Sequence, residues 1–345
     1  TAENEEYSFA NMPRAGRKAF SMAQGYHLSA ELKQFFARDA IEKGLPLFRG
    51  EFDRGIRDKS AWFIAAPLWN TYWTALWCLT YKLDMWNVRS QMMDEAELYA
   101  PALEFFTVWA GYKKAQTSLG AWIAFRDDLD CADTKRFPES RYGACQQGAN
   151  PARFDAIARE FAPWGARQDD PEGTHLKGLE VVKNQKGLND VQWDVWRGNY
   201  GMYMKQIRAN ETSQGYWRVG SKDQMYGRFA RGFDHAQKKN AIYLDIDDGL
   251  FGAEPLSGRS PVSVRVVYFD KGTGAWQLRY DSTSEPDKLA REVTNTDSGL
   301  WKELTLDLAD AHFDNRGPME SDLWLANSDE QNEIFHMVEI RKTAK

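Results

Sequence analysis

The chain has 345 residues, enough for two domains of ordinary size, and 43% of them are hydrophobic, so it can bury a substantial core. Its formal net charge is −6 and it has no long basic run, which counts against a nucleic-acid partner because phosphate binding needs clustered Lys and Arg. It contains no run of 18 uncharged apolar residues, so we expect no membrane-spanning helix.

Residues 1–126 are predicted to alternate between helices and short strands. Residues 45–53 form an apolar run that ends in charged residues, which is typical of a buried strand in a parallel sheet. Residues 83–88 read as a second short strand of this kind. Capping residues and prolines predict helices at about 29–43, 67–81 and 101–125. Units of this type build parallel sheets or barrels.

Residues 127–211 are poorly patterned and are predicted to be a loop-rich helical connector. Within this segment, Cys131 and Cys145 bracket a polar loop. A disulfide between them would close a loop of ~15 residues and stabilise the fold by about 3 kcal/mol. That bridge would imply an oxidising compartment, whereas two separate thiols fit the pattern equally well.

Residues 212–345 change to a hydrophobic period of two, which predicts an antiparallel β-sandwich of the jelly-roll type. Val262, Val264 and Val266 alternate with residues that would face the other side of a strand. The glycine-containing segment 270–274 then predicts a hairpin turn.

Metal sites have weak sequence signals. The five histidines are scattered without ligand spacing, which argues against zinc. Asp245 and Asp247 could supply oxygen ligands for a structural Ca²⁺ ion, and solvated acidic side chains are the alternative. We expect no other cofactor.

The strongest candidate for chemistry is Glu51, which follows the predicted strand 45–53. If that strand belongs to a barrel, the carboxyl lies at its C-terminal end, where barrel active sites form. Arg49 could hold it in place, Trp86 could form the floor of a sugar subsite, and Asn87 and Arg89 could donate to hydroxyls. The alternatives are a surface Glu51 and a core Trp86.

The segments LPLFRGEFD (45–53) and LTYKLDMWNVR (79–89) resemble the seventh and eighth strands of a clan A, β-galactosidase-like glycoside hydrolase barrel. The resemblance implies that Glu51 is the nucleophile, that Trp86 closes the subsite and that Tyr7 bonds the nucleophile. It identifies no acid/base carboxylate, because that residue belongs to the fourth strand and the first five strands have no counterpart here. The chain is therefore expected to be the C-terminal part of a longer enzyme.

The tail resembles the jelly-roll modules that are appended to polysaccharide-degrading enzymes. The segments that carry this resemblance are VRVVYFDKGTGAWQLRYD and SGLWKELTLDL. Trp276, Trp301 and Trp324 are candidate platforms for sugar rings, because indole faces stack on C–H groups. The alternative for each of them is the sandwich core.

Together these features predict the end of a (β/α)₈-type barrel (1–126), a connector (127–211) and a β-sandwich (212–345). The predicted function is retaining hydrolysis of a plant or algal polysaccharide or oligosaccharide by a secreted or periplasmic protein. Three alternatives stay open: a non-catalytic carbohydrate-binding protein, a polysaccharide lyase with a helical domain before a sandwich, and a structural scaffold. The expected partner is carbohydrate, and association into a homo-oligomer is left open.

Overall fold

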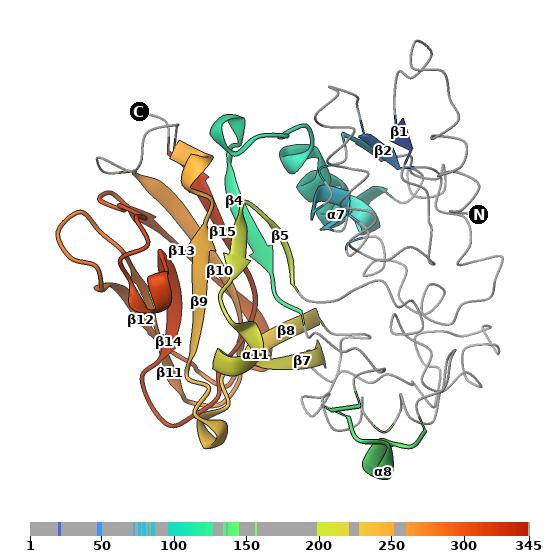
Figure 1. Ribbon diagram of the computed structural model, residues 1–345, viewed down its shortest axis with the longest axis vertical. Helices are drawn as coiled ribbons and strands as arrows, with labels where there is room; N and C mark the ends of the chain where they lie inside the picture. Colours follow the sequence, from blue (N-terminus) through green and yellow to red (C-terminus); the bar gives the residue numbers. More distant parts are fainter. Residues whose placement is uncertain are drawn as a thin grey trace. The chain divides into compact units, whose positions relative to one another are not determined.

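Figure 1 shows the computed structural model, which describes the chain continuously at 96–126, 199–220, 228–251 and 260–343. Shorter described stretches are 20–21, 47–49, 72, 75–76, 78–80, 82, 84–86, 134–135, 137–144 and 156. The chain divides into two compact units. Unit 1 comprises Thr1–Lys113, Leu129–Glu160 and Arg167–Arg197, and unit 2 comprises Lys114–Asp128, Phe161–Ala166 and Gly198–Lys345.

Unit 1 contains a small parallel sheet of three strands. In sheet order these are β1 (Phe20–Ser21), β2 (Leu47–Arg49) and β3 (Met85–Trp86). Both pairs are parallel, with Arg49 opposite Trp86 in the register. This confirms that strands lie within 45–53 and 83–88 and that they are parallel neighbours. A closed eight-stranded barrel stays a prediction.

The described helices of unit 1 are α7 (Ala96–Trp109) and the short α8 (Glu139–Tyr142). On α7, the Phe105 ring lies 6.4 Å from the Tyr72 ring and 6.2 Å from the Trp109 ring. The helix predicted at 101–125 is wrong at both ends. Gly111 has a φ of 87°, and such a left-handed residue commonly follows the last turn of a helix.

Unit 2 is a sandwich of two antiparallel sheets (Figure 1), as the period of two predicts. The first sheet has the order β13-β10-β15-β4-β5, with β8 also paired with β15 and β7 paired with β8. The second sheet has the order β12-β11-β14-β9-β6. The strands are β4 (Gly120–Ala124), β5 (Tyr200–Met202), β6 (Met204–Gln206), β7 (Gln214–Val219), β8 (Arg228–Gly232), β9 (Ala241–Ile246), β10 (Val262–Asp270), β11 (Ala275–Tyr280), β12 (Lys288–Thr294), β13 (Leu300–Leu308), β14 (Leu323–Asn327) and β15 (Ile334–Lys342).

The sandwich begins earlier in the chain than residue 212. Strand β4, which was expected to continue a helix, lies between β15 and β5, and all five of its residues are buried. A strand that is covered on both faces lacks alternation, so its sequence gives no period of two. A Cβ at Gly120 would lie 1.9 Å from the Ile340 carbonyl oxygen, so this close pairing requires glycine.

The core of unit 2 lies between the two sheets. Alternate residues of β10 and β11 face it, and six of them are buried: Val262, Val264, Val266, Trp276, Leu278 and Tyr280. Each such side chain contributes about 1.5–3 kcal/mol by leaving water. Because these positions point inward, the residues between them on β11 point to the solvent side of the second sheet.

Candidate functional site

Most of the residues predicted for unit 1 lie outside the described residues. These are Tyr7, Glu51, Asn87 and Arg89, together with the two cysteines of the predicted disulfide, Cys131 and Cys145. The two that are described, Arg49 and Trp86, lie opposite each other on β2 and β3. The predicted catalytic arrangement therefore stays a prediction.

The three candidate tryptophan platforms are largely packed within unit 2. Trp276 is 0% exposed, and its ring lies 5.2 Å from the Tyr268 ring and 5.0 Å from the Phe335 ring. Trp324 is 2% exposed. Neither offers a ring face to a ligand, because Trp276 points into the core and Trp324 is covered by a loop described below.

Trp301 is partly buried beneath the hairpin of β7 and β8. Its Nε1 donates to the Val219 carbonyl at 3.2 Å, and its ring packs 5.2 Å from Phe269 and 5.8 Å from His336. The Arg228 guanidinium lies 5.3 Å from its centroid. These contacts show that Trp301 packs the hairpin against strands β10 and β15 of the same sheet.

The carboxylates predicted to bind Ca²⁺ already have protein partners. Asp245 forms an ion pair of 2.8 Å with Lys205, and Asp247 Oδ1 accepts from the Gly249 N–H at 2.9 Å. Over the part of the chain that the structure describes, no three His, Cys, Asp or Glu side chains gather in a metal-binding group. Nothing in the geometry therefore favours a Ca²⁺ ion at these two residues.

A different candidate site lies on the solvent side of the second sheet, which we call the outer face. One row of residues crosses four neighbouring strands there: Leu289 is paired with Arg279, Arg279 with Trp324, and Trp324 with Tyr243. Tyr243 is half-buried. Burial and the nearby negative charge of Asp287 raise the pKa of Tyr243, so its hydroxyl stays protonated and can donate.

A chain of polar side chains runs along the outer face over β11 and β12. Arg279 Nε donates to Asp287 Oδ1 at 2.5 Å, and its Nη1 donates to Gln277 Oε1 at 2.8 Å. Gln277 Nε2 in turn donates to Glu292 Oε2 at 2.7 Å. These contacts hold four planar groups in place, while Asp287 and Glu292 remain open to water.

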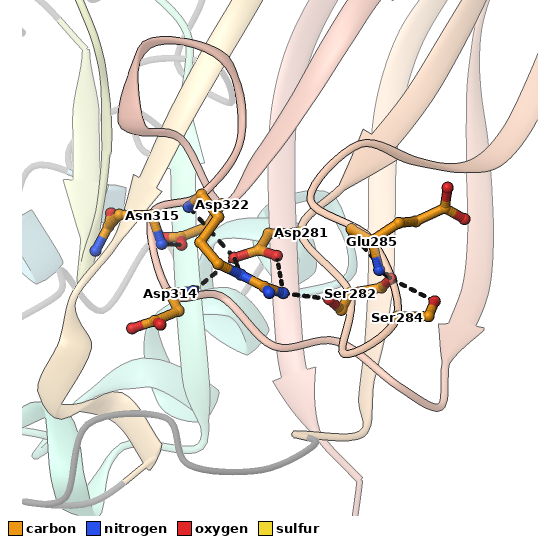
Figure 2. Close-up of polar contacts among 8 residues, drawn as sticks. Asp281, Ser282, Ser284, Glu285, Asp314, Asn315 and Asp322 are labelled. Carbon is orange, nitrogen blue, oxygen red and sulfur yellow. Dashed lines mark hydrogen bonds and ion pairs between the residues drawn. The ribbon is translucent and has the colours of Figure 1, made fainter.

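The loop between β13 and β14 is fastened beside this face by two buried carboxylates (Figure 2). The Asp281 carboxylate accepts from the Asp314 N–H at 2.9 Å and from Arg316 Nη2 at 2.6 Å. The Asp322 carboxylate accepts from the Asn315 N–H at 2.9 Å. It also accepts from the Ile246 N–H at 2.8 Å. We call this region the loop end of the sandwich.

The fastened loop explains why Trp324 is covered. A Cβ at Gly317 would lie 2.6 Å from Cζ3 of Trp324, so the loop backbone rests directly on the indole. Behind the loop, Arg316 Nη2 also donates to the Ser282 carbonyl, and the Ser282 hydroxyl accepts from the Glu285 N–H at 3.1 Å. The loop is therefore held in a fixed position and forms a wall of the outer face.

The two carboxylates of the loop end differ in their electrostatics. Asp281 receives a guanidinium, whereas the hydrogen bonds of Asp322 come from two backbone N–H groups. Burial raises the pKa of Asp322 to about 7, with further contributions from the charges of Asp245 and Asp281. Asp322 thus gains a proton within the physiological pH range.

Sequence reasoning missed the residues of the outer face, although the pattern contains a signal for them. In the segments AIYLDI and AWQLRY, the core residues alternate with Tyr243 and Asp245 and with Gln277 and Arg279. The inward half of this period of two identifies the core, and its outward half carries the signal for the outer face.

Comparison with known proteins gave matches among solved structures alone: no family model and no curated protein matches the chain. One similar structure is the Clostridium thermocellum endo-1,4-β-D-xylanase 10B with its CBM22-1 and GH10 modules (14% identity, TM-score 0.27), where the match covers 41% of this chain and 26% of that one. A second is the carbohydrate-binding module CBM6cm-2 of Cellvibrio mixtus lichenase 5A with cellotriose (9% identity, TM-score 0.21, 41% and 100% covered).

A third similar structure is the C-terminal CBM6 of the laminarinase LamC from Zobellia galactanivorans, at 10% identity and a TM-score of 0.23, covering 40% of this chain and 99% of that one. The chain spans about a quarter of the xylanase that it matches. At such TM-scores we take nothing about function from these likenesses.

Proposed function

We propose that unit 2 binds carbohydrate without cleaving it, and that it does so over the outer face. The observation that supports this proposal is the hydrogen-bonded chain from Asp287 through Arg279 and Gln277 to Glu292, whose Asp287 end acts electrostatically on the half-buried Tyr243. Side chains that are already held in place lose little freedom when a ligand binds, so their hydrogen bonds contribute more of their energy to affinity.

The chemistry of these groups suits sugars. Neighbouring sugar hydroxyls present paired donors and acceptors, which match the two-pronged carboxylate, amide and guanidinium groups of the outer face. The Tyr243 ring adds a flat apolar surface with a polar tip, a combination that is favoured at wet sites.

Truncating a single side chain of the outer face tests the proposal. We expect Arg279→Ala and Tyr243→Ala each to weaken binding of the full chain to a retained polysaccharide about tenfold or more, as measured by affinity electrophoresis in gels with xylan, β-glucan or laminarin. A hydrogen bond to a charged group is worth roughly 1.5–3 kcal/mol, and 1.4 kcal/mol is a factor of ten.

The matched control is Thr305→Ala, an exposed position on β13 of the first sheet. It should migrate like the unchanged protein in every gel. Equal retardation of the Arg279 and Tyr243 variants and of the unchanged protein would show that the outer face is not the binding surface.

The second candidate function is retaining glycoside hydrolysis by unit 1. The observation that favours it is the parallel pairing of β2 with β3, which brings Arg49 and Trp86 opposite each other where the clan A resemblance requires adjacent strands. In this proposal Glu51 follows β2 as the nucleophile, and the acid/base carboxylate has no assigned residue.

The hydrolase proposal is tested with Glu51→Gln in the longest natural form of the protein, with polysaccharide breakdown followed by reducing-end release. We expect loss of turnover with retained binding in affinity gels. Undiminished turnover would exclude Glu51 as nucleophile, and an unsaturated product that absorbs in the ultraviolet would indicate a lyase instead.

Both proposals place the protein outside the cytoplasm, because polysaccharides are met there, so we extend them to a secreted or periplasmic location. Within the described residues, none of the helices is both long and apolar enough to cross a membrane.

A further inference from the structure

The loop between β13 and β14 contains a segment, residues 314–320, whose side chains contribute little to the core. The residues on either side of the segment are buried: Phe313 is 1% exposed and lies 6.0 Å from the Phe251 ring, and Ser321 is 0% exposed. Every residue within the segment is exposed or half-buried. Burial therefore fixes the two bases of the segment, and its middle is held chiefly by polar contacts.

These polar contacts are made to the two buried carboxylates of the loop end (Figure 2). Asp281 accepts from the Asp314 N–H at 2.9 Å and from Arg316 Nη2 at 2.6 Å. Asp322 accepts from the Asn315 N–H at 2.9 Å. The position of the segment thus depends on the ionisation of these two carboxyl groups.

The backbone of the segment is strained. Asn315, Met319 and Glu320 have φ angles of 57°, 59° and 61°, in the left-handed region that residues with a side chain rarely adopt. Met319 and Glu320 are exposed, so burial of their side chains does not offset the strain. A strained segment that is held by polar contacts opens at a low cost in free energy.

The residue beneath the segment is Trp324, on which the backbone of Gly317 rests. Trp324 is 2% exposed, although its place in β14 directs it to the outer face. Its register neighbours there are Arg279 and Tyr243. Movement of the segment away from the sheet would therefore uncover an indole in the middle of the row that carries the proposed carbohydrate site.

We propose that residues 314–320 form a lid that closes over Trp324 and that, on opening, adds the indole to the outer face. The role of the uncovered ring rests on the proposed carbohydrate function, because a flat indole face stacks on the C–H groups of a sugar. The closed lid removes this platform and is an autoinhibitory contact. The lid itself is inferred from the strain, the polar contacts and the covered indole, without reference to a ligand.

The protonation of Asp322 biases the lid. Burial raises the pKa of Asp322 to about 7 and the charges of Asp245 and Asp281 add to this, although the Ile246 and Asn315 N–H groups act in the opposite direction. Opening admits water to the carboxyl group, which favours its charged form. The closed state therefore binds the proton more tightly, and deprotonation favours opening as the pH rises through about 7.

The charges around Asp322 support this direction. Asp245 on β9 is paired with Lys205 on β6 at 2.8 Å, and Asp281 after β11 is paired with Arg316 of the lid at 2.6 Å. Among the described residues, no cation is paired with Asp322, whose donors are backbone N–H groups. A negative charge on Asp322 is therefore repelled by both neighbouring carboxylates while the lid is closed.

The lid is tested by hydroxyl-radical footprinting of the full chain at pH 6 and pH 8, with oxidation of each tryptophan followed by mass spectrometry. We expect Trp324 to be oxidised about threefold faster or more at pH 8, whereas the core residue Trp276 stays protected at both pH values. Arg316→Ala removes the guanidinium from Asp281 and should expose Trp324 at pH 6 as well. Asp322→Asn has no proton to lose in this range and should give equal rates at the two pH values.

The matched control is Glu320→Gln, which removes an exposed carboxylate of the lid and should keep the pH response. The proposal is overturned if Trp324 stays as protected as Trp276 both in the unchanged protein at pH 8 and in Arg316→Ala. It is also overturned if Glu320→Gln loses the pH response while Asp322→Asn keeps it.

Affinity electrophoresis separates the lid from the carbohydrate proposal. In a gel with a retained polysaccharide, we expect Arg316→Ala to bind about threefold more tightly or better than the unchanged protein, and Trp324→Ala added to that variant to remove the gain. An open lid without this gain would overturn the role of Trp324 in binding. If no polysaccharide retards the unchanged protein or the variants, carbohydrate binding by the outer face is contradicted, and the footprint still supports or overturns the lid.

Discussion

The two ends of the β-sandwich differ in how their buried carboxylates are hydrogen-bonded. At the loop end, the buried carboxylates of Asp281 and Asp322 receive backbone N–H groups and a guanidinium, and together they fasten the loop that covers Trp324. At the turn end, which is the end of the sandwich that carries the β10–β11 turn, Asp270 is bonded in the same way, but Glu333 Oε2 and Asn295 Oδ1 receive no donor from the described residues. Burial raises the pKa of Glu333 to about 8.

This difference separates carboxylates that have a structural role from carboxylates that are free to bind a ligand. A buried carboxylate whose oxygens already accept hydrogen bonds has no capacity left for a ligand. A buried carboxylate whose lone pairs are open costs stability unless something else binds there. The loop end therefore supports the outer face as a wall, whereas the turn end leaves a buried carboxylate oxygen without a donor among the described residues.

The largest effect is expected at the loop end, from Asp281→Ala. The variant loses the acceptor for the Asp314 N–H and leaves Arg316 without its carboxylate, so we expect a loss of about 3 kcal/mol in the free energy of unfolding, measured in urea. Asp314→Ala, which changes an exposed side chain of the same loop, should cost well under 1 kcal/mol. Similar losses in both variants would contradict the anchoring role of Asp281.

An intermediate effect is expected from the titration of Asp322. Because its pKa in the folded state is raised to about 7, the folded state binds this proton more tightly than the unfolded state. Its contribution to stability is therefore fully present below the unfolded pKa of about 4 and is lost as the pH rises to about 7.

We expect urea unfolding at pH 5 and pH 8 to show this loss, and Asp322→Asn to reduce the difference between the two pH values by roughly 1–3 kcal/mol. The neutral amide accepts one N–H fewer, so the variant starts from lower stability at pH 5. An unchanged pH difference in the variant would mean that Asp322 is ionised throughout this range.

The smallest effect is expected at the turn end, from Lys302→Met. The substitution keeps the apolar stem and removes the ammonium, which lies 2.6 Å from Asp270 Oδ2. Lys302 is partly exposed and Asp270 keeps its bonds to Thr296 and Ser298, so we expect a loss of about 1 kcal/mol at pH 7.

The contribution of the Lys302–Asp270 ion pair to stability depends on pH with the opposite sign to that of Asp322. Burial alone would raise the pKa of Asp270, but the Lys302 ammonium and the Ser298 and Thr296 donors lower it. This stabilisation is present above the unfolded pKa of about 4 and is lost in more acidic solution. Lys302→Met should therefore differ from the unchanged protein at pH 7 and converge with it at low pH, while Arg291→Met, an exposed change on β12, should show neither effect.

Much of the sandwich could be predicted from the sequence because its strands alternate. Residues of β10 and β11 show the period of two, and the structure places each strand in an antiparallel sheet. The hairpin predicted at 270–274 is wrong, because β10 belongs to the first sheet and β11 to the second, so this turn connects the two sheets. Strand β4 could not be found in this way, because burial on both faces removes the alternation. Its assignment depends on pairing with β15, which is distant in the chain.

The site was harder to predict than the fold. Tryptophan count and strand position made Trp276, Trp301 and Trp324 equal candidates, and packing against Phe335, the β7–β8 hairpin and the loop at Gly317 decided against exposed faces. The outer-face chain through Arg279 depends on cross-strand register, which brings Gln277 opposite Glu292.

The sequence by itself determined that residues 212–345 form antiparallel strands with one apolar side, because side chains alternate along a strand whatever its neighbours are. Only the tertiary structure decided which polar groups are satisfied. Glu333 and Asp270 are both acidic residues beside apolar strands, and they differ because Lys302, Thr296 and Ser298 reach one and not the other. Such long-range contacts depend on how distant segments pack, which no local pattern encodes.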